Sequence, residues 1–331
     1  MITFIIRRLL IMIPTLFVIS IISFAIIQLP PGDYLTSYMA NLEQTGETRD
    51  EAVIASLKAR YGLDQPMHVQ YWRWISGVVK GDFGQSFSMN RPVKELIWER
   101  LGLTVVISLC TIFFTWIIAI PIGIYSATHK YTPADYFFTF IGFIGMATPS
   151  FMIALVLMNF AQERLGVSVG GLFSDDYINA PWSWGRIVDL LKHIWIPVIV
   201  LGVGGTAGLI RTVRANLLDQ LEMPYVVTAR AGGLSEWRLL LKYPVRVAVN
   251  PVVSTIGWML PGIVSGSVIV AVVLSLPITG PLLLDALMDQ DMYLAGSFVM
   301  LLSALTVIGT LISDILLAWV DPRIRFERRG S

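Results

Sequence analysis

The stretch that decides the fold is Pro224-Tyr-Val-Val-Thr-Ala-Arg-Ala-Gly-Gly-Leu-Ser-Glu-Trp-Arg-Leu-Leu-Leu-Lys-Tyr-Pro244, which lies between two strongly apolar segments. It belongs to a polar interruption, residues 211–250, that holds six basic and three acidic residues. A segment with this many charges cannot lie in hydrocarbon, because unpaired charges are very costly in an apolar medium. It must therefore form a loop on an aqueous side of the structure that the apolar segments build.

Proline and glycine predict two short helices within this loop. Pro224 suits the first position of a helix because it has no N–H that needs a partner, and Gly232-Gly233 supplies the left-handed residue that commonly ends one. We expect a helix of about two turns up to this glycine pair, and then a second helix through Trp237 to Lys242. The spacing alone leaves two interpretations open, an ordinary solvated loop and a docking element.

The sequence Tyr225-Val-Val-Thr-Ala-Arg-Ala-Gly-Gly-Leu-Ser235 resembles the cytoplasmic "EAA" loop of ABC importer permeases, in the form found in the dipeptide/oligopeptide group. Thr228, Ala229 and Gly233 fall on the family pattern, and Val227 stands where the family's glutamate would be. In that family the short helix before the glycine fits a groove on the ATPase subunit. The resemblance implies a coupling helix made of Pro224, Tyr225, Thr228, Ala229, Arg230, Ala231, Gly232, Gly233 and Leu234.

The composition is that of a membrane protein. The chain has 331 residues, of which 55% are hydrophobic and only 14% are charged, with a mean hydropathy of +0.69. A soluble domain of this length would be far less apolar. The net charge of +1 gives no electrostatic reason to expect a nucleic-acid partner. The single cysteine, Cys110, lies in an apolar run, where we expect it to act as a small hydrophobic residue.

Six apolar runs predict an all-α polytopic membrane protein with six transmembrane helices. The first, residues 9–29, follows Arg7-Arg8 and at about 1.5 Å per residue is long enough to cross a bilayer. It is longer than the apolar region of a secretory signal and lacks a cleavage site, so we expect it to be retained. The other runs are approximately 101–127, 136–160, 194–210, 252–274 and 297–320.

The runs divide the chain into four parts. Residues 1–29 form the first transmembrane helix, 30–99 an external helical region, 100–320 a five-helix permease core that contains the loop 211–250, and 321–331 a C-terminal tail. In the external region we expect a helix after Gln65-Pro66 that either lies on the membrane surface or packs against the transmembrane bundle. Its apolar side is predicted to hold Tyr71, Trp72, Trp74, Ile75, Val78 and Val79.

Three further segments resemble the same permease family. Gly81-Asp-Phe-Gly-Gln-Ser86, followed by Arg91-Pro-Val93, is similar to the family's external "GDxGxS…PV" segment. Leu276-Pro-Ile-Thr-Gly-Pro-Leu-Leu-Leu-Asp285 is similar to its outer "WPGLGxLLxxA" segment, and Asp321-Pro-Arg-Ile-Arg325 to its usual end. The chain departs from the family at the outer side, where Leu276 replaces the usual tryptophan and Ile278-Thr279 the usual Gly-Leu. Ala271 stands where peptide permeases often have a glutamate. The candidates for an outer mouth are Ala271, Leu276, Thr279 and Asp285.

The distribution of basic residues predicts the orientation in the membrane. The loop 211–250 holds six basic residues, whereas residues 275–296 hold none and three aspartates. Because cytoplasmic loops are enriched in lysine and arginine, we expect both termini and the loop 211–250 in the cytoplasm. The membrane would be the plasma or inner membrane of a bacterium or an archaeon.

No motif in the sequence predicts catalysis. HExxH, GxSxG and a Walker lysine loop are absent, and His68, His129 and His193 are too far apart for a local metal-ligand motif. We therefore expect no catalytic residue, cofactor or metal in this chain, and ATP and Mg²⁺ would bind to partner subunits. The ionisable Asp314, in the last apolar run, is expected to pair with an arginine at the membrane interface.

The resemblance implies a permease subunit of an ATP-driven importer. Its partners would be a second homologous permease, two ATP-binding subunits, an external solute-binding protein and the membrane lipid. The family default is a di- or oligopeptide solute, and the departures at the outer side make an oligosaccharide the alternative. A self-contained channel or an ion-coupled carrier is the rival class, but carriers typically show an inverted internal repeat, and we find none.

Overall fold

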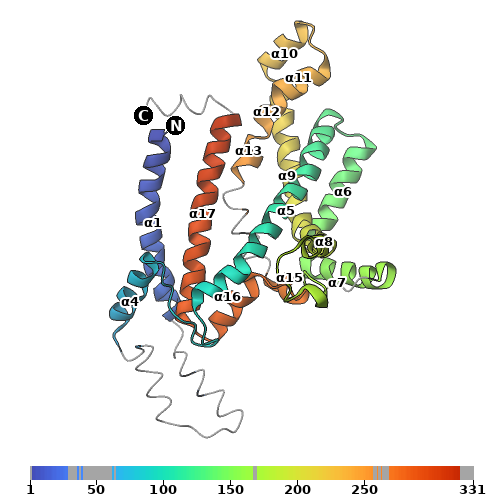
Figure 1. Cartoon of the computed structure of the whole chain (residues 1–331). Coiled ribbons are helices and arrows are strands. Elements are labelled where there is room, and N and C mark those ends of the chain that lie inside the picture. Colours follow the sequence, from blue (N-terminus) through green and yellow to red (C-terminus); the bar gives the residue numbers. More distant parts are fainter. Residues whose placement is uncertain are drawn as a thin grey trace. The chain divides into compact units, whose positions relative to one another are not determined.

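The computed structural model describes residues 2–28, 36, 39, 62, 65–166, 170–255, 259, 262 and 268–320 (Figure 1). These residues form helices and contain no strand beyond an isolated bridge between Gln85 and Pro92. The all-α prediction is therefore confirmed. The chain forms two compact units, one of residues 1–104 with 278–307 and one of residues 105–277 with 308–331.

Four of the described helices are long and apolar enough to cross a membrane, and a bent helix pair is a fifth candidate. The four are α1 (Ile2–Gln28), α5 (Val93–Thr128), α9 (Trp195–Leu221) and α17 (Met292–Val320). The predicted span 252–274 lies partly outside the described residues. Two short helices, α13 (Asn250–Ser254) and α15 (Val268–Val273), occupy its two ends.

The predicted third span, residues 136–160, is not one straight helix. It consists of α6 (Pro133–Ala147) and α7 (Ser150–Phe160), and the chain bends by 101° between them. Thr148 is extended, with φ −84° and ψ 125°, because the residue before a proline avoids the helical conformation. Pro149 also lacks the N–H that would continue the helical hydrogen bonds. A single turn of π-helix, η1 (Ala161–Leu165), continues α7.

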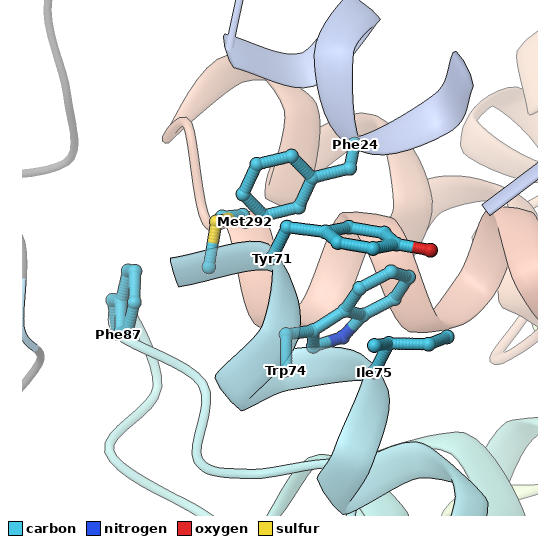
Figure 2. Packing of buried hydrophobic residues seen from close by; sticks show 6 residues of the cluster. All are labelled: Phe24, Tyr71, Trp74, Ile75, Phe87 and Met292. Carbon is cyan, nitrogen blue, oxygen red and sulfur yellow. The ribbon is translucent and has the colours of Figure 1, made fainter. Parts of the chain in front are cut away.

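An aromatic cluster forms the core of the first unit. The helix α4 (Met67–Val79) packs against α1, and Figure 2 shows Phe24, Tyr71 and Trp74 facing one another. The ring of Phe24 lies 5.4 Å from that of Tyr71 and 6.0 Å from that of Trp74, between centroids. The tyrosine hydroxyl also lies 2.8 Å from the hydroxyl of Ser20 on α1. The predicted amphipathic helix therefore packs against a membrane-spanning helix.

Two residues expected on the buried side of α4 are exposed instead. Trp72 is 59% exposed and Val79 is 82% exposed. Trp72 follows Tyr71 directly and so points about 100° away from it around the helix, and Val79 is the last residue of α4, beyond the buried face. The buried face of the helix is thus narrower than the pattern of apolar residues predicted.

A buried carboxylate fixes residues 86–88 to the start of α17. Oδ2 of Asp291 accepts hydrogen bonds from the Ser86 hydroxyl at 2.6 Å and from the N–H groups of Phe87 and Ser88 at 2.6 and 3.2 Å. Oδ1 accepts one from the N–H of Leu294 at 3.1 Å. Burial raises the pKa of the Asp291 carboxyl, and these four bonds act in the opposite direction because they favour the ionised form. The serine of the "GDxGxS" segment is thus one donor to this carboxylate.

The two glycines of the same segment both have a left-handed backbone. Gly81 has φ +81° and Gly84 has φ +78°, a region that residues with a side chain rarely adopt. A Cβ at Gly84 would also lie 2.5 Å from Cδ1 of Tyr293, whereas a Cβ at Gly81 would meet no atom within 4 Å. Gly81 is therefore needed only because of its left-handed backbone. Gly84 is needed for its left-handed backbone and also because the Tyr293 ring leaves no room for a Cβ.

We expect Gly84→Ala to destabilise the protein more than Gly81→Ala. Both changes place a Cβ on a left-handed residue, which costs about 1 kcal/mol, and only Gly84→Ala also overpacks the Tyr293 ring, at a further cost of about 1–3 kcal/mol. Thermal unfolding of the purified protein in detergent measures the difference. In the double variant Gly84→Ala with Tyr293→Ala, the cost of overpacking should be absent and only the cost of the left-handed backbone should remain. Equal unfolding midpoints for the two glycine variants would contradict this account.

Helix α9 is the centre of the second unit. Helices α5, α6, α7 and α12 (Pro244–Ala248) pack against it. Glycines allow the close approach, since a Cβ at Gly123 of α5 would lie 2.7 Å from Cβ of Val213. A Cβ at Gly145 of α6 would lie 2.7 Å from the side chain of Val203. Small residues at such contacts are typical of helices that pack within membranes.

The loop before α9 is folded around one carboxylate and one arginine. It contains a short 3₁₀ turn, η2 (Asp175–Tyr177), and the helix α8 (Trp184–His193). Asp189 accepts hydrogen bonds from the N–H and the hydroxyl of Ser174. The Arg186 guanidinium lies between two rings, 4.6 Å from that of Phe173 and 4.8 Å from that of Trp182.

Candidate functional site

The loop between α9 and α12 folds into two helices, as predicted. They are α10 (Pro224–Ala231) and α11 (Glu236–Lys242), and they project beyond the ends of α5, α6 and α9 (Figure 1). Met223 precedes α10 in an extended conformation, with φ −71° and ψ 142°, and Pro224 takes the first helical position. The local chemistry of proline therefore sets the point where α9 ends and α10 begins.

Gly233 supplies the left-handed residue after α10. Its φ is +77°, whereas Gly232, the C-cap residue of α10, has φ −74°. The turn is closed by hydrogen bonds of 3.0 Å from the N–H of Gly232 to the carbonyl of Thr228 and from the N–H of Gly233 to the carbonyl of Arg230. A Cβ at Gly233 would meet nothing within 4 Å, so the position needs glycine for its conformation and not for space.

An ion pair and two buried side chains hold α10 against α11. The Arg230 guanidinium donates to both carboxylate oxygens of Glu236, at 2.7 and 3.2 Å. The pair raises the pKa of Arg230 and lowers the pKa of Glu236. Both side chains are exposed, so the pair orients the two helices but contributes little stability. The apolar contacts come from Val226 and Leu239, which are fully buried.

Four exposed apolar side chains surround this helix pair: Met223, Val227, Trp237 and Leu241. We call them the docking surface. Exposed apolar side chains on a polar loop are candidates for a protein–protein contact, where tryptophan is enriched.

The residues of the predicted coupling helix differ in their exposure. Ala229 and Leu234 are half-buried, and the others are exposed: Pro224, Tyr225, Thr228, Arg230, Ala231, Gly232 and Gly233. The Tyr225 hydroxyl donates to Oε1 of Gln220 at 2.7 Å and so ties α10 to the last turn of α9. The Thr228 hydroxyl donates to the carbonyl of Pro224 within the helix.

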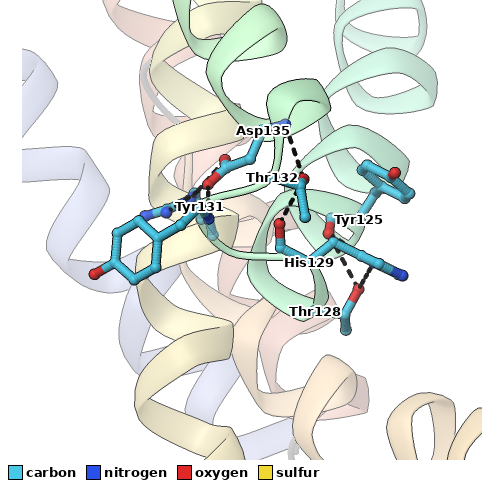
Figure 3. Close-up of polar contacts among 7 residues, drawn as sticks. Tyr125, Thr128, His129, Tyr131, Thr132 and Asp135 are labelled. Atoms are coloured by element: carbon cyan, nitrogen blue, oxygen red, sulfur yellow. Dashed lines mark hydrogen bonds and ion pairs between the residues drawn. The ribbon is translucent and has the colours of Figure 1, made fainter.

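A second ion pair connects the start of α6 to α9. It lies near the two-helix loop between α9 and α12, which we call the docking loop. Nη2 and Nε of Arg214 donate to the two carboxylate oxygens of Asp135, at 2.8 and 3.1 Å. The same carboxylate accepts the N–H of Tyr131, and the Thr132 hydroxyl caps α6 by accepting the N–H of Asp135 (Figure 3). The α5–α6 loop, α6 and α9 are therefore joined at one buried carboxylate.

Sequence analysis missed this pair. Thr132-Pro-Ala-Asp135 has the spacing of a helix cap followed by an acidic residue in the first turn, which would have marked Asp135. Arg214 was counted only among the basic residues of the loop. Its partner is 79 residues away in sequence, and no local pattern indicates it.

The outer-mouth candidates lie in different units. Ala271 and Leu276 are buried in the second unit, and the N–H of Leu276 donates to the carbonyl of Ala271 at 2.8 Å. In the first unit, Thr279 begins α16 (Thr279–Met288), where it is buried against the Thr104 hydroxyl, and Asp285 is exposed.

Two further predictions concern metal ligands and Asp314. Within the described part of the chain, no three histidine, cysteine or acidic side chains gather as metal ligands would. The arginines expected to pair with Asp314 lie beyond residue 320 and so outside the described residues.

The long apolar helices and the two short helices between α9 and α12 fit a multi-pass membrane protein. Residues 119–326 match the family described as "Binding-protein-dependent transport system inner membrane component", and residues 1–109 match the N-terminal region of the same kind of protein. The chain belongs to this family. It is a permease subunit of an ABC importer, in the dipeptide/oligopeptide group, and a multi-pass inner membrane protein.

The similar proteins cover the whole length of the chain. It is 37% identical over 328 residues to the oligopeptide transport system permease protein AppB of Bacillus subtilis, which covers 98% of this chain and 100% of that protein. It is 31% identical over 327 residues to the glutathione transport system permease protein GsiC of Salmonella paratyphi A, with 99% and 100% covered. The oligopeptide transport system permease protein OppB of Haemophilus influenzae is 30% identical over 328 residues, with 98% and 100% covered.

We expect Gly233→Val to lower transport and Gly233→Asn to preserve it. Valine is strained in the left-handed conformation by about 1–2 kcal/mol, whereas asparagine adopts it more readily, so only valine should disturb the turn that orients α10 and α11. Transport by the assembled importer and solute binding to the separate binding protein are the measurements, and binding should stay normal in both variants. Normal transport by Gly233→Val would show that the left-handed turn has no role in coupling.

Proposed function

We propose that this chain forms half of the translocation path of an ATP-driven importer for di- and oligopeptides. A second homologous permease would form the other half, two ATP-binding subunits would bind at the docking loops, and an external binding protein would deliver the solute. ATP and Mg²⁺ belong to the ATP-binding subunits in this proposal. The observation that carries it is the docking surface, which lies on a loop that continues directly from a membrane-spanning helix.

The connection between the docking surface and the membrane is short and stiff. Only Glu222 and Met223 separate α9 from α10, and Tyr225 holds α10 to Gln220 of α9. The Asp135–Arg214 pair then joins α9 to α6. A displacement imposed on α10 by an ATP-binding subunit would therefore reach two spanning segments without passing through a flexible linker.

The relatives favour a peptide as the solute. Proteins that are 30–37% identical over nearly the whole chain are named for oligopeptide and glutathione transport. Oligosaccharide import by the same machinery is the alternative, because the departures at Ala271, Leu276 and Thr279 remove features of the peptide group from the outer segment. Membership of a binding-protein-dependent family argues against a self-contained channel or ion-coupled carrier.

We also propose that both termini and the docking loop lie in the cytoplasm, where ATP is available. The five basic residues that follow Arg211 in 211–250, and the absence of any in 275–296, support this orientation. Residues 30–99 would then lie outside, near the binding protein.

Single cysteines at Ser235 and Asp289, in a Cys110→Ala background, should be labelled from opposite faces of the membrane. Both native side chains are exposed, Ser235 before α11 and Asp289 after α16. A membrane-impermeant thiol reagent added to intact spheroplasts should label the cysteine at 289 and should reach the one at 235 only after the membrane is opened. Labelling of both positions on intact spheroplasts would refute the orientation.

Trp237→Ala should weaken retention of the ATP-binding subunits. Trp237 is 67% exposed on the docking surface, and truncating a central tryptophan typically costs about 2 kcal/mol or more, which is roughly 30-fold in affinity. The measurement is the amount of ATP-binding subunit that copurifies with the permease. The matched control is Trp184→Ala, which removes a 79% exposed tryptophan from α8. Equal retention in both variants would exclude this surface as the ATPase contact.

A further inference from the structure

Arg211 is a charged residue inside the membrane-spanning helix α9. It lies ten residues before Leu221, the last residue of the helix, and its side chain is exposed. Nη2 lies 3.3 Å from Sδ of Met146, and Cζ lies 5.6 Å from the centre of the Phe143 ring. Among the residues that the structure describes, no carboxylate lies within ion-pair distance of it. Charged residues in spanning helices usually face a polar cavity or pair with another charge.

The contact with Met146 sets the depth of the guanidinium. Met146 comes thirteen residues after Pro133, the first residue of α6, which corresponds to about 20 Å of helix. Helical side chains lean toward the helix N-terminus by up to one turn, so the contact lies on the order of 15 Å from the α5–α6 loop. Arg214, one turn later in α9, is bonded to Asp135 at that loop. Arg211 therefore points away from the loop and into the spanning part, and does not snorkel toward it.

The face of α9 around Arg211 is unlike a surface that contacts lipid. Before it in α9, Gly204 is exposed and Gly208 is half-buried, and a Cβ at either would meet no described atom within 4 Å. Lipid-facing helix surfaces are made of large apolar side chains. The exposed face of α6 has such a surface, with Tyr136, Phe137, Phe140, Ile141 and Ile144. The glycine face of α9 leaves open space beside a cation, which suits water and a passing solute.

Arg211 also lines a pocket between α6 and α9. The pocket wall includes Phe138, Gly142, Phe143, Met146 and Ala207. It thus combines apolar and aromatic walls with a guanidinium that has no carboxylate partner among the described residues. Guanidinium groups bind carboxylates through paired N–H donors. The pocket has a volume of only about 20 Å³, room for about one water molecule, so a ligand of the guanidinium would lie beside it and not inside it.

We propose that Arg211 binds the terminal carboxylate of a peptide solute during its passage along the face of α9 that carries Gly204 and Gly208. This inference rests on the proposed import of peptides. It also separates the two candidate solutes, because a neutral oligosaccharide has no carboxylate for Arg211 to bind. The glycine face of α9 gives the solute room to approach the guanidinium.

The first test measures charge preference in the assembled importer. Uptake of trialanine and of its C-terminal amide into proteoliposomes is measured with saturating loaded binding protein, and the affinity of the binding protein for each is measured separately. The wild type should prefer the free acid by about tenfold or more, the effect expected for one lost charge-assisted hydrogen bond. Arg211→Gln should bring the two rates within about threefold of each other, Arg211→Lys should keep the preference, and stimulation of ATP hydrolysis should be unchanged.

The matched control is Arg164→Gln, which removes an exposed arginine from η1 and should leave the preference as in the wild type. An acid-to-amide ratio that is the same in the wild type and in Arg211→Gln would overturn the proposal. So would loss of stimulated ATP hydrolysis in Arg211→Gln, because that result would assign Arg211 to coupling and not to solute binding.

A second test measures the access of solvent and solute to position 211. In a Cys110→Ala background, the cysteine of Arg211→Cys should react with a hydrophilic methanethiosulfonate in the assembled importer and should be protected by binding protein loaded with trialanine. A cysteine that stays unmodified with and without ATP, or that cross-links to the second permease, would overturn the proposal. Uptake of maltotriose but not of trialanine would instead refute the peptide function itself.

Discussion

The ion pair between Asp135 and Arg214 is the constraint on which the second unit depends. Its two parallel hydrogen bonds fix the relative orientation of α6 and α9 as well as their distance. The carboxylate is buried, so removing Arg214 would leave a charge without a partner, which is strongly destabilising. Only two residues separate α9 from α10, so the ion pair connects α6 to the helix that leads into the docking loop. A force on the docking loop acts on a braced pair of helices and not on α9 alone.

Two arginines one turn apart in α9 show how local geometry separates structural from functional charges. Arg214 reaches a carboxylate, and its charge is used within the fold. Among the described residues, Arg211 contacts a thioether and an aromatic ring and no carboxylate, and in our proposal its charge binds a ligand. Glycine is also used in two ways, since Gly145 allows α6 to approach α9, while a Cβ at the half-buried Gly208 would meet no described atom within 4 Å.

Local chemistry was predictable from the sequence, and long-range pairing was not. The proline at 224 and the glycine at 233 predicted two short helices and the break between them, because both residues act through their own backbone. Pro149 was counted as a tolerated residue within a span, although it marks a bend of 101°. A sequence pattern does not say whether neighbouring helices allow a proline to be absorbed or require the chain to turn. The carboxylates of Asp135 and Asp291 are used by partners 79 and 205 residues away, which no local pattern reveals.

The hydrogen bond between Ser86 and Asp291 can form only late in the synthesis of the chain, because the two residues are 205 positions apart. At about 5–20 residues per second, the ribosome would add the aspartate roughly 10 to 40 s after the serine. Until then the N–H groups of Phe87 and Ser88 lack the acceptor that they have in the finished protein. Buried N–H groups need a partner, so this segment must remain hydrated while the intervening spans are inserted. The segment 86–88 can therefore reach its final order only when nearly the whole chain has been made, and a truncated product would leave these N–H groups without the Asp291 carboxylate.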